Sequence, residues 1–341
     1  MTRIRSGITT AVIVGISTTG FADQAMYPGN RPPLQPSAFI SLPLGAVKPA
    51  GWLRDQLVVQ ARGMTGHLDE FYKTVSDSAW KGDSGDAWER GPYYLDGLVP
   101  LAFQLDDERL LAKVKTWMEP ILASSRADGW FGPEKNPDRW PLAVALKVLV
   151  QYHEATGDER ALRVIQGYVG YLNAHPPDWP DKSWPGVRAM ENLVALYWYY
   201  NRTGDAAALA VAKSIHDNCF RWADYFTDFP FPREKIEAAM AGGKAIEGHP
   251  AHVVNIAMAI KYPGLWWQQS GDARDKGASF AGIRALDEHH GQVGGRFSGD
   301  EHLSGTRPTQ GTETCGVVEY MFSIENLLRI FGDAALADRL E

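Results

Sequence analysis

The sequence predicts an all-α fold, an (α/α)6 toroid of helical hairpins that is incomplete at its C-terminus. Two observations lead to this prediction. Short helix-to-helix connectors that end in Asp recur along the chain, and strongly apolar helical segments alternate with segments that carry a single apolar stripe. Repeated two-helix units are typical of solenoids and closed helical arrays, because each hairpin buries its apolar face only against its neighbours.

The connectors contain the residues that a tight helix-helix turn requires. Gly followed by Asp occurs in four of the five, and the fifth has Asp106 in place of the Gly. The Gly ends one helix in a left-handed conformation and the Asp caps the next. The five connectors are residues 105–107, 156–158, 203–205, 270–272 and 331–333.

The helices on the two sides of each connector differ in character. The segment before a connector is apolar on several faces, whereas the segment after it is amphipathic. Helices that are apolar all round are buried, and helices with one apolar stripe lie outside them. We therefore expect an inner ring of helices within an outer ring. The expected inner helices are Tyr93–Leu105, Leu142–Tyr152, Met190–Tyr200, Val253–Trp267 and Val317–Phe331.

The chain divides into a signal peptide (residues 1–22), a linker (23–41) and a partial toroid domain (42–341). Two arginines, a short apolar stretch and small residues near position 22 are typical of a secretory leader. The apolar stretch is too short to cross a bilayer, so we expect a secreted or periplasmic protein with no membrane anchor after cleavage. The last hairpin stops at Glu341, so ring closure is not expected within this chain.

Charge and cysteine content narrow the functional classes. The chain has 41 acidic and 34 basic residues, for a net charge of −7, and no basic stripe. This balance argues against a nucleic-acid partner. Of the two cysteines, Cys219 shares the apolar face of a helix, and we interpret it as core packing. Cys315 has a different setting and is a candidate for chemistry.

The connections from each outer helix to the next inner helix are long, and long loops in compact domains usually carry function. These loops and their edges are rich in aromatic residues, among them Trp130 and Trp140. Flat aromatic faces suit sugar rings, so both are candidate substrate-binding residues. The alternative is that such rings only fasten the loops to the core.

The last long loop, residues 291–311, carries Asp300, Glu301 and His302 among several glycines. Together with Glu313, these residues supply paired carboxylates, the usual apparatus for cleaving a glycosidic bond. One carboxyl group donates a proton while the other attacks or activates water. The alternative is a solvated acidic loop.

Glu313-Thr314-Cys315 opens the last inner helix. Glu313 at a helix N-terminus could simply interact with the helix dipole. The same dipole favours a thiolate, so we expect a lowered pKa for Cys315. A carboxylate and a thiolate are also two of the four ligands of a zinc site. No CxxC or HExxH motif supplies the other two ligands, so the spacing alone does not establish a metal.

Two histidines, His249 and His252, precede another inner helix on the same rim. At a helix start, residues three apart can point in the same direction. Both are candidates for substrate contact, as are His302 and Gln310 in the last long loop. The alternatives for the two histidines are a structural hydrogen-bonding role and metal ligation.

Four motifs resemble glycoside hydrolase family 127, the β-L-arabinofuranosidases and their relatives. They are DGWFGP (128–133), GHPAH (248–252), GDEH (299–302) and, above all, QGTETCGVVEYM (310–321). The resemblance covers roughly Pro43 to the C-terminus. It implies a six-hairpin toroid followed by β-sandwich domains. It also implies a retaining mechanism in which a zinc-bound cysteine thiolate attacks the anomeric carbon and a glutamate acts as acid/base.

In that family, zinc is held by the Glu-x-Cys motif and by a later pair of cysteines, one of which is the nucleophile. Glu313 and Cys315 match the first two ligands, and His249 matches a sugar-contacting histidine. The acid/base corresponds to Asp300 or Glu301. The later cysteines would lie beyond Glu341, so the resemblance implies that this chain is inactive alone.

These observations predict a secreted glycoside hydrolase whose partner is an oligo- or polysaccharide. One alternative is a two-carboxylate toroid glycosidase or lyase on uronic sugars, in which Cys315 takes no part. Another is a non-catalytic carbohydrate-binding toroid.

Overall fold

The computed structural model describes residues 28–176, 182–244 and 246–341. The predicted signal peptide lies outside these residues. Within them, the regular structure is helical except for one two-stranded sheet, formed by β1 (Gly299–Asp300) and β2 (His302–Leu303). The all-α prediction is confirmed. None of the described helices combines the length and the apolar character needed to cross a membrane.

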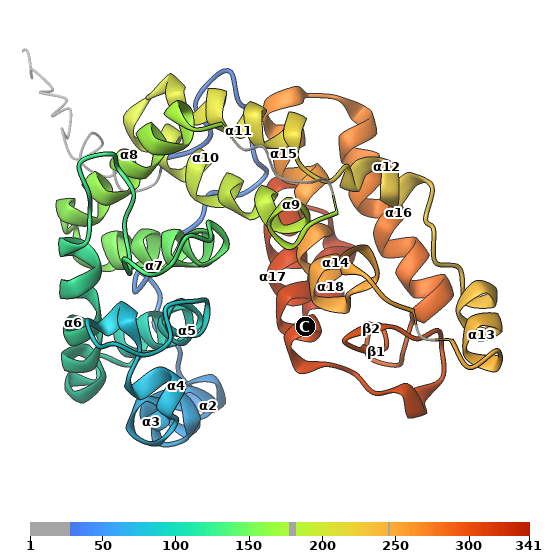
Figure 1. The fold of residues 1–341 in the computed structure, drawn as a ribbon, viewed down its shortest axis with the longest axis horizontal. Coiled ribbons are helices and arrows are strands. Elements are labelled where there is room, and N and C mark those ends of the chain that lie inside the picture. The colour runs from blue at the N-terminus through green and yellow to red at the C-terminus, as the bar shows by residue number, and fades with distance from the viewer. Residues whose placement is uncertain (1–27, 177–181, 245) are drawn as a thin grey trace, which may run out of the picture.

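Helical hairpins follow one another around an arc, as a toroid requires (Figure 1). Each inner helix packs against the outer helix that follows it, and neighbouring inner helices pack against each other. The inner helices are α5 (Arg90–Leu105), α7 (Trp140–Thr156), α10 (Asn192–Thr203), α14 (Val253–Ala259) with α15 (Tyr262–Ser270), and α17 (Thr314–Phe331). The outer helices are α6 (Glu108–Ala123), α8 (Glu159–Ala174), α11 (Ala206–Asn218), α16 (Ala273–His290) and α18 (Ala334–Leu340).

Shorter elements fill the N-terminal region and the long loops. Before the first hairpin lie α2 (Gly51–Arg62), α3 (Met64–Phe71), α4 (Lys73–Ser76) and the 3₁₀ helix η1 (Ala79–Lys81). Between hairpins lie α9 (Trp184–Arg188), η2 (Ala189–Glu191), α12 (Trp222–Thr227), α13 (Arg233–Ala241), η3 (His249–Ala251) and η4 (Pro308–Gln310).

The five connectors have the predicted geometry. In each, the Asp side chain accepts a hydrogen bond from a backbone N–H in the first turn of the next helix, as Asp107 does from Leu110 at 3.0 Å. The four glycines before these caps have φ between 65° and 74°, and Asp106 has φ 52°. Because these turns are encoded locally, the hairpin pattern is readable from the sequence.

One inner helix differs from the prediction. The segment Val253–Trp267, expected to be one helix, is divided into α14 and α15. Pro263 has no backbone N–H with which to bond the carbonyl of Ala259, so the helical hydrogen-bond ladder is interrupted there. At the break, the Lys261 side chain is fully buried and forms a 2.7 Å ion pair with Glu191.

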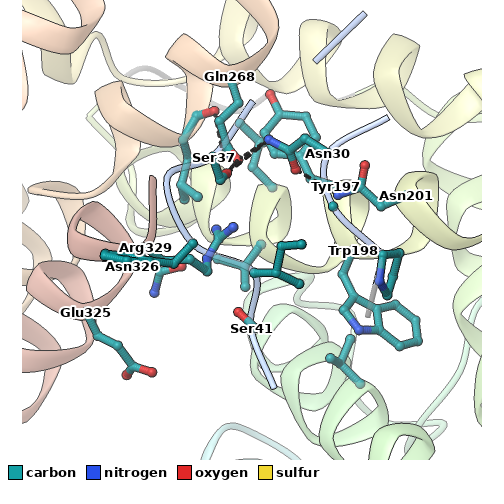
Figure 2. Close-up of a pocket in the computed structure, with 18 of the residues that line it drawn as sticks. Asn30, Ser37, Ser41, Tyr197, Trp198, Asn201, Gln268, Glu325, Asn326 and Arg329 are labelled. Carbon is teal, nitrogen blue, oxygen red and sulfur yellow. Dashed lines mark hydrogen bonds between the residues drawn. The ribbon is translucent and has the colours of Figure 1, made fainter. Parts of the chain in front are cut away.

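Residues 28–41, which include part of the predicted linker, lie across the C-terminal ends of the inner helices (Figure 2). The Gln35 N–H donates to the Gln268 carbonyl at 2.6 Å, and the Ala38 N–H donates to the Ile330 carbonyl at 3.0 Å. A cavity of about 190 Å³ lies beside this segment. The N-terminal ends of the inner helices, by contrast, meet the long loops at the opposite rim.

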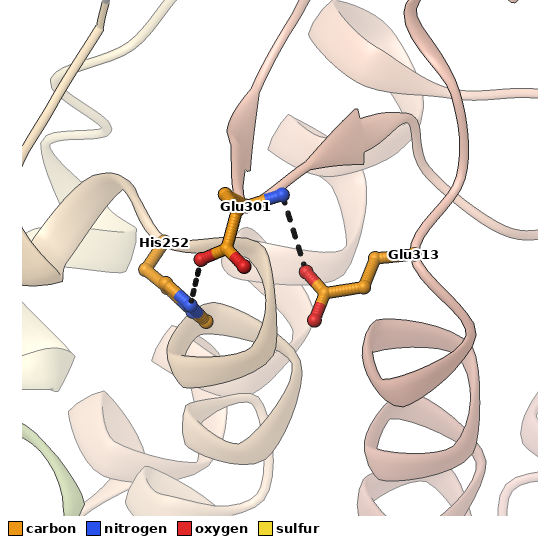
Figure 3. Close-up of side chains that lie close together, drawn as sticks. All are labelled: His252, Glu301 and Glu313. Atoms are coloured by element: carbon orange, nitrogen blue, oxygen red, sulfur yellow. Dashed lines mark hydrogen bonds and ion pairs between the residues drawn. The ribbon is translucent and has the colours of Figure 1, made fainter.

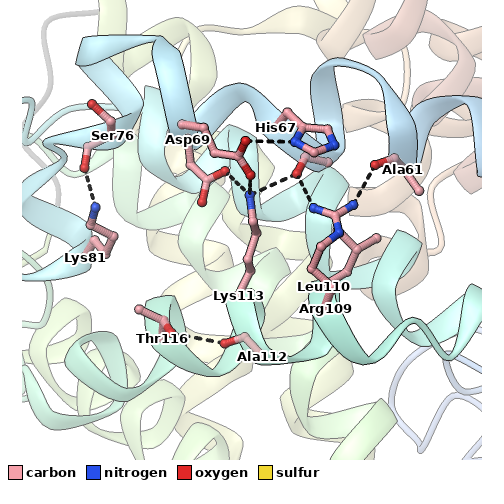
Figure 4. A network of polar contacts seen from close by, with 12 residues as sticks. Ala61, His67, Asp69, Ser76, Lys81, Arg109, Leu110, Ala112, Lys113 and Thr116 are labelled. Carbon is pink, nitrogen blue, oxygen red and sulfur yellow. Dashed lines mark hydrogen bonds and ion pairs between the residues drawn. The ribbon is translucent and has the colours of Figure 1, made fainter.

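A polar network joins the N-terminal helices to the first hairpin (Figure 4). Arg109 and Lys113 of α6 both donate to the carbonyl of Gly66 at 2.9 Å. Lys113 also pairs with Asp69 at 2.6 Å and Glu70 at 2.7 Å. The α2–α3 region is therefore attached to the toroid through specific charged contacts as well as apolar packing.

Candidate active site

A cavity of about 530 Å³ lies at the long-loop rim, where the inner helices begin. Its size is within the range of small-molecule sites. Several lining residues immediately precede an inner helix or lie in its first turns, so the positive ends of several helix dipoles face the cavity. The lining residues are Trp88, Glu89, Tyr93, Trp184, Arg188, His252, Val254, Glu301, Glu313, Thr314, Cys315, Val318 and Glu319.

Glu301 is at the tip of the β1–β2 hairpin, between the paired residues Asp300 and His302. Its φ of 64° is in the left-handed region, which non-glycine residues adopt at a cost of roughly 1–2 kcal/mol. This backbone directs the carboxylate of Glu301 toward His252 (Figure 3). Asp300 is exposed and does not line the cavity. The structure therefore brings Glu301, and not Asp300, into the candidate site.

His252 caps α14 and holds Glu301. Its Nδ1 accepts the N–H of Val254 at 3.2 Å, so Nε2 carries the ring proton and donates to Glu301 at 3.1 Å. Burial, with the Arg188 cation as a second cause, lowers the pKa of His252 from its ordinary value to about 4. His252 is therefore a neutral hydrogen-bond donor near pH 7.

Glu313 occupies the N-cap position of α17 but makes no capping hydrogen bond with its side chain. Its carboxylate instead accepts the backbone N–H of Glu301 at 3.2 Å (Figure 3). Burial raises the pKa of Glu313, and the nearby Glu301 and Asp300 charges add to this shift. The side chain thus interacts with the cavity loop, which a helix-capping role does not explain.

Cys315 lines the same cavity, and neither it nor the buried Cys219 forms a disulfide. The predicted low thiol pKa is wrong. Burial raises the pKa of Cys315, and the Glu313 carboxylate raises it further. These two effects outweigh the helix dipole, which is worth typically 0.3–1 kcal/mol.

The donors at the rim suit a metal cation. Ligand atoms of His252, Glu301 and Glu313 lie within 4.8 Å of one another. Cys315 lines the same cavity, although its sulfur does not belong to that group of three. Nitrogen, carboxylate oxygen and thiolate sulfur are the ligands that Zn²⁺ takes in proteins. A divalent cation would also offset the charges that raise the pKa of Glu313 and Cys315.

Arg188 forms one wall of the cavity and was not predicted from the sequence. Its guanidinium lies 3.9 Å from the ring centroid of Trp184 and 4.5 Å from that of Trp140. It also pairs with Glu89 at 3.3 Å and donates to Asn255 at 2.7 Å. Arg188 and Glu319 each interrupt an apolar segment of the sequence. A charged residue in such a segment was the signal that could have identified both as candidate site residues.

Two predicted histidines lie next to the cavity without lining it. The His249 ring packs edge-on against Trp184, with centroids 5.0 Å apart. The His302 ring lies 5.8 Å from the ring of His252. Both therefore support residues of the cavity wall.

The other predicted substrate-binding residues, Trp130, Trp140 and Gln310, do not line the cavity. Trp130 is 5% exposed and packs edge-on against Tyr168 and Tyr171. Trp140 is 3% exposed and lies behind Arg188, where its indole N–H donates to Glu89. Gln310 belongs to the short η4 turn. In the structure Trp130 packs against tyrosines of α8 and Trp140 against Arg188, and the substrate contacts of all three residues stay a prediction.

The fold and the site together define a helical-hairpin toroid with a cavity at one rim that contains acidic residues and a thiol. The family model of the GH127 β-L-arabinofuranosidase catalytic domain matches residues 77–341. The chain therefore belongs to glycoside hydrolase family 127, and the resemblance of its motifs is confirmed.

Solved structures agree on the fold. A structure described as a glycoside hydrolase matches with a TM-score of 0.64 and 14% identity, covering 89% of this chain and 50% of that one. The GH127 β-L-arabinofuranosidase Ara127N-Se from Geobacillus stearothermophilus T6 matches with a TM-score of 0.62 and 17% identity, covering 86% and 54%. The GH127 β-arabinofuranosidase BT3674 matches with a TM-score of 0.60 and 15% identity, covering 93% and 54%.

The chain thus spans about half the length of these structures. No curated protein matches its sequence.

Proposed function

We propose that the protein is a β-L-arabinofuranosidase-like glycoside hydrolase that cleaves oligo- or polysaccharides by a retaining mechanism. The observation that carries the proposal is the convergence of Glu301, Glu313, His252 and Cys315 on one cavity. These residues come from three separate parts of the chain and supply a candidate acid/base and two candidate zinc ligands; the cysteine nucleophile that the family resemblance implies is not among them. Export from the cytoplasm is part of the proposal, because residues 1–22 have the composition of a signal peptide.

Glu301 is the proposed acid/base. It is at the mouth of the cavity with its side chain 68% exposed, so it can exchange protons with solvent between steps. The N–H of His252 fixes one carboxylate oxygen and leaves the other for the glycosidic oxygen of a substrate. Asp300, one residue earlier, is exposed to solvent but does not line the cavity, so it does not face a substrate bound there.

Glu313 and Cys315 are the proposed zinc ligands, because both line the cavity and are two residues apart at the start of α17. When bound, zinc would keep the Cys315 sulfur as a thiolate and offset the local negative charge. The chain's own contribution is to hold Glu313 against the Glu301 backbone and to place the thiol in the first turn of α17.

The charges of the cavity favour a neutral sugar. Four glutamates, at positions 89, 301, 313 and 319, line it, and its one arginine already pairs with Glu89. A uronic-acid carboxylate would meet several like charges and no free arginine among the lining residues. This argues against the alternative of a glycosidase or lyase for uronic sugars.

Hydrolysis of 4-nitrophenyl glycosides by the natural protein tests the proposal. We expect release of 4-nitrophenol from the β-L-arabinofuranoside and none above background from the β-D-glucuronide. Proton NMR of the first-formed sugar should show the anomeric configuration of the substrate. Preferred cleavage of the glucuronide, or an inverted product, would contradict the proposal.

A further inference from the structure

Glu319 lies on the floor of the cavity, one helical turn beyond Cys315 on α17. Residues four apart on a helix share a face, so the face that presents the thiol also presents this carboxyl group. Its side chain is 6% exposed, in contrast to Glu301 at the cavity mouth. No role in the proposed acid/base and zinc chemistry falls to Glu319.

One oxygen of Glu319 is bound and the other is free. Oε1 accepts the hydroxyl proton of Tyr93 at 3.0 Å. Oε2 is buried and has no hydrogen-bond partner among the described residues. A buried polar atom without a partner destabilises the folded protein, so such atoms are rare unless a ligand or water completes their hydrogen bonding.

The nearest buried cations are already paired with other carboxylates. Lys147 pairs with Asp96 at 2.9 Å, and Lys261 pairs with Glu191 at 2.7 Å. Burial raises the pKa of Glu319, although both lysines oppose the shift. Oε2 can form a hydrogen bond with a sugar hydroxyl in either protonation state, because an ionised carboxylate accepts and a protonated carboxyl group donates.

We propose that Glu319 is a sugar-binding residue whose Oε2 forms a hydrogen bond with a hydroxyl group of the sugar in the cavity. The inference rests on the proposed function only in taking the occupant to be a sugar. Tyr93 orients the carboxyl group by holding its other oxygen. A sugar carboxylate in the cavity would lie near Glu89, Glu301 and Glu313, which line it together with Glu319.

Isothermal titration calorimetry with L-arabinose and with D-galacturonic acid tests this role, because neither monosaccharide can be hydrolysed. Glu319→Leu keeps the approximate volume and removes both oxygens. Glu319→Gln keeps an acceptor for Tyr93 and a donor for the sugar. Glu325→Leu is the matched control, since Glu325 lies on the same helix but lines the cavity at the opposite rim (Figure 2).

We expect Glu319→Leu to weaken L-arabinose binding at least tenfold, which corresponds to the loss of one well-formed hydrogen bond of about 1.4 kcal/mol. Glu319→Gln should bind within about threefold of the wild type, and Glu325→Leu should be unchanged. Wild-type protein should bind D-galacturonic acid at least tenfold more weakly than L-arabinose.

Unchanged binding by Glu319→Leu, or an equal loss in Glu325→Leu, would overturn the inference. So would a wild-type protein that binds D-galacturonic acid as tightly as L-arabinose, or that binds neither. If Glu319→Leu does not fold, Tyr93→Phe replaces it: removing the orienting hydroxyl should weaken L-arabinose binding about threefold or more, and no change would contradict the proposal. Glu319-dependent binding without hydrolysis would leave this inference standing while the proposed function fails.

Discussion

The Nε2 atom of His252 lies 3.1 Å from a carboxylate oxygen of Glu301, although 49 residues separate the two in sequence. Each partner is fixed by its own local structure. His252 caps a helix through its Nδ1, and Glu301 is at a hairpin tip with a left-handed backbone. The carboxylate is therefore oriented by the fold before any substrate binds, which is the condition for efficient proton transfer.

Replacing His252 should impair catalysis more than binding. We expect His252→Phe to lower kcat about 10–100-fold with KM within about threefold, because Glu301 loses the donor that orients it. Steady-state kinetics on an aryl β-L-arabinofuranoside measures both. His302→Phe is the control, since His302 contacts the His252 ring but does not line the cavity. Equal effects of the two substitutions would contradict the positioning role.

His290 should make the protein less stable in mild acid. It is fully buried, its Nε2–H donates to the Phe231 carbonyl at 2.8 Å, and its Nδ1 accepts the Gly305 N–H at 3.0 Å. Burial lowers the pKa of His290 from 6.5 to about 4. Between these values the unfolded chain binds a proton that the folded chain does not, so the free energy of unfolding falls as pH drops from about 6.5 to 4.

Urea unfolding at several pH values checks this prediction. The His290 contribution should be on the order of 3 kcal/mol over that interval. In His290→Phe, the slope of the free energy of unfolding against pH should decrease, by at most the amount that corresponds to one bound proton. His289→Phe, at the neighbouring position, should keep the wild-type slope. If His290→Phe and the wild type show the same slope, the two hydrogen bonds do not hold His290 neutral.

Lys113→Met should destabilise the attachment of the N-terminal helices. The substitution leaves the mostly buried Asp69 without its cation, at a cost of about 2 kcal/mol in the free energy of unfolding. Lys73→Met is the control, because Lys73 is 89% exposed in its pair with Asp77 and an exposed ion pair contributes little to stability. Chemical denaturation measures the free energy of unfolding of both variants. If Lys113→Met loses no more stability than Lys73→Met, the network does not stabilise the attachment of the N-terminal helices.

The natural protein should contain about one zinc ion per chain, measured by plasma mass spectrometry after dialysis. Glu313→Gln and Cys315→Ser each remove a proposed ligand and should lower the zinc content at least tenfold. Cys219→Ala should retain the metal, since Cys219 is buried in the core. A wild-type protein without zinc, or full zinc content in both ligand variants, would rule out the proposed centre.

The helical-hairpin pattern could be predicted from the sequence because its signals are local. A Gly that ends one helix and an Asp that caps the next lie side by side in the chain, as in Gly157-Asp158. The break between α14 and α15 was missed because the apolar pattern continues through Pro263. The fold class can therefore be predicted from short-range sequence signals. Whether Val253–Trp267 forms one helix or two depends on a single residue, Pro263.

The candidate site was predictable only in part. Motifs identified Glu301, Glu313 and Cys315, but the choice between Asp300 and Glu301 depends on the register of a two-residue hairpin. Glu319 was missed because its partner Tyr93 is 226 residues away. The thiol pKa was predicted in the wrong direction because burial and a neighbouring charge depend on tertiary structure.

The adjacent pair Asp300 and Glu301 allows the most direct test of the account. We expect Glu301→Gln to reduce kcat/KM on an aryl β-L-arabinofuranoside by about 10²–10⁴-fold, because the acid/base is lost. Asp300→Asn, one residue away on the same hairpin, should retain activity within about threefold. Equal activity of the two variants, or a larger loss in Asp300→Asn, would contradict the claim that Glu301 is the catalytic carboxylate of this cavity.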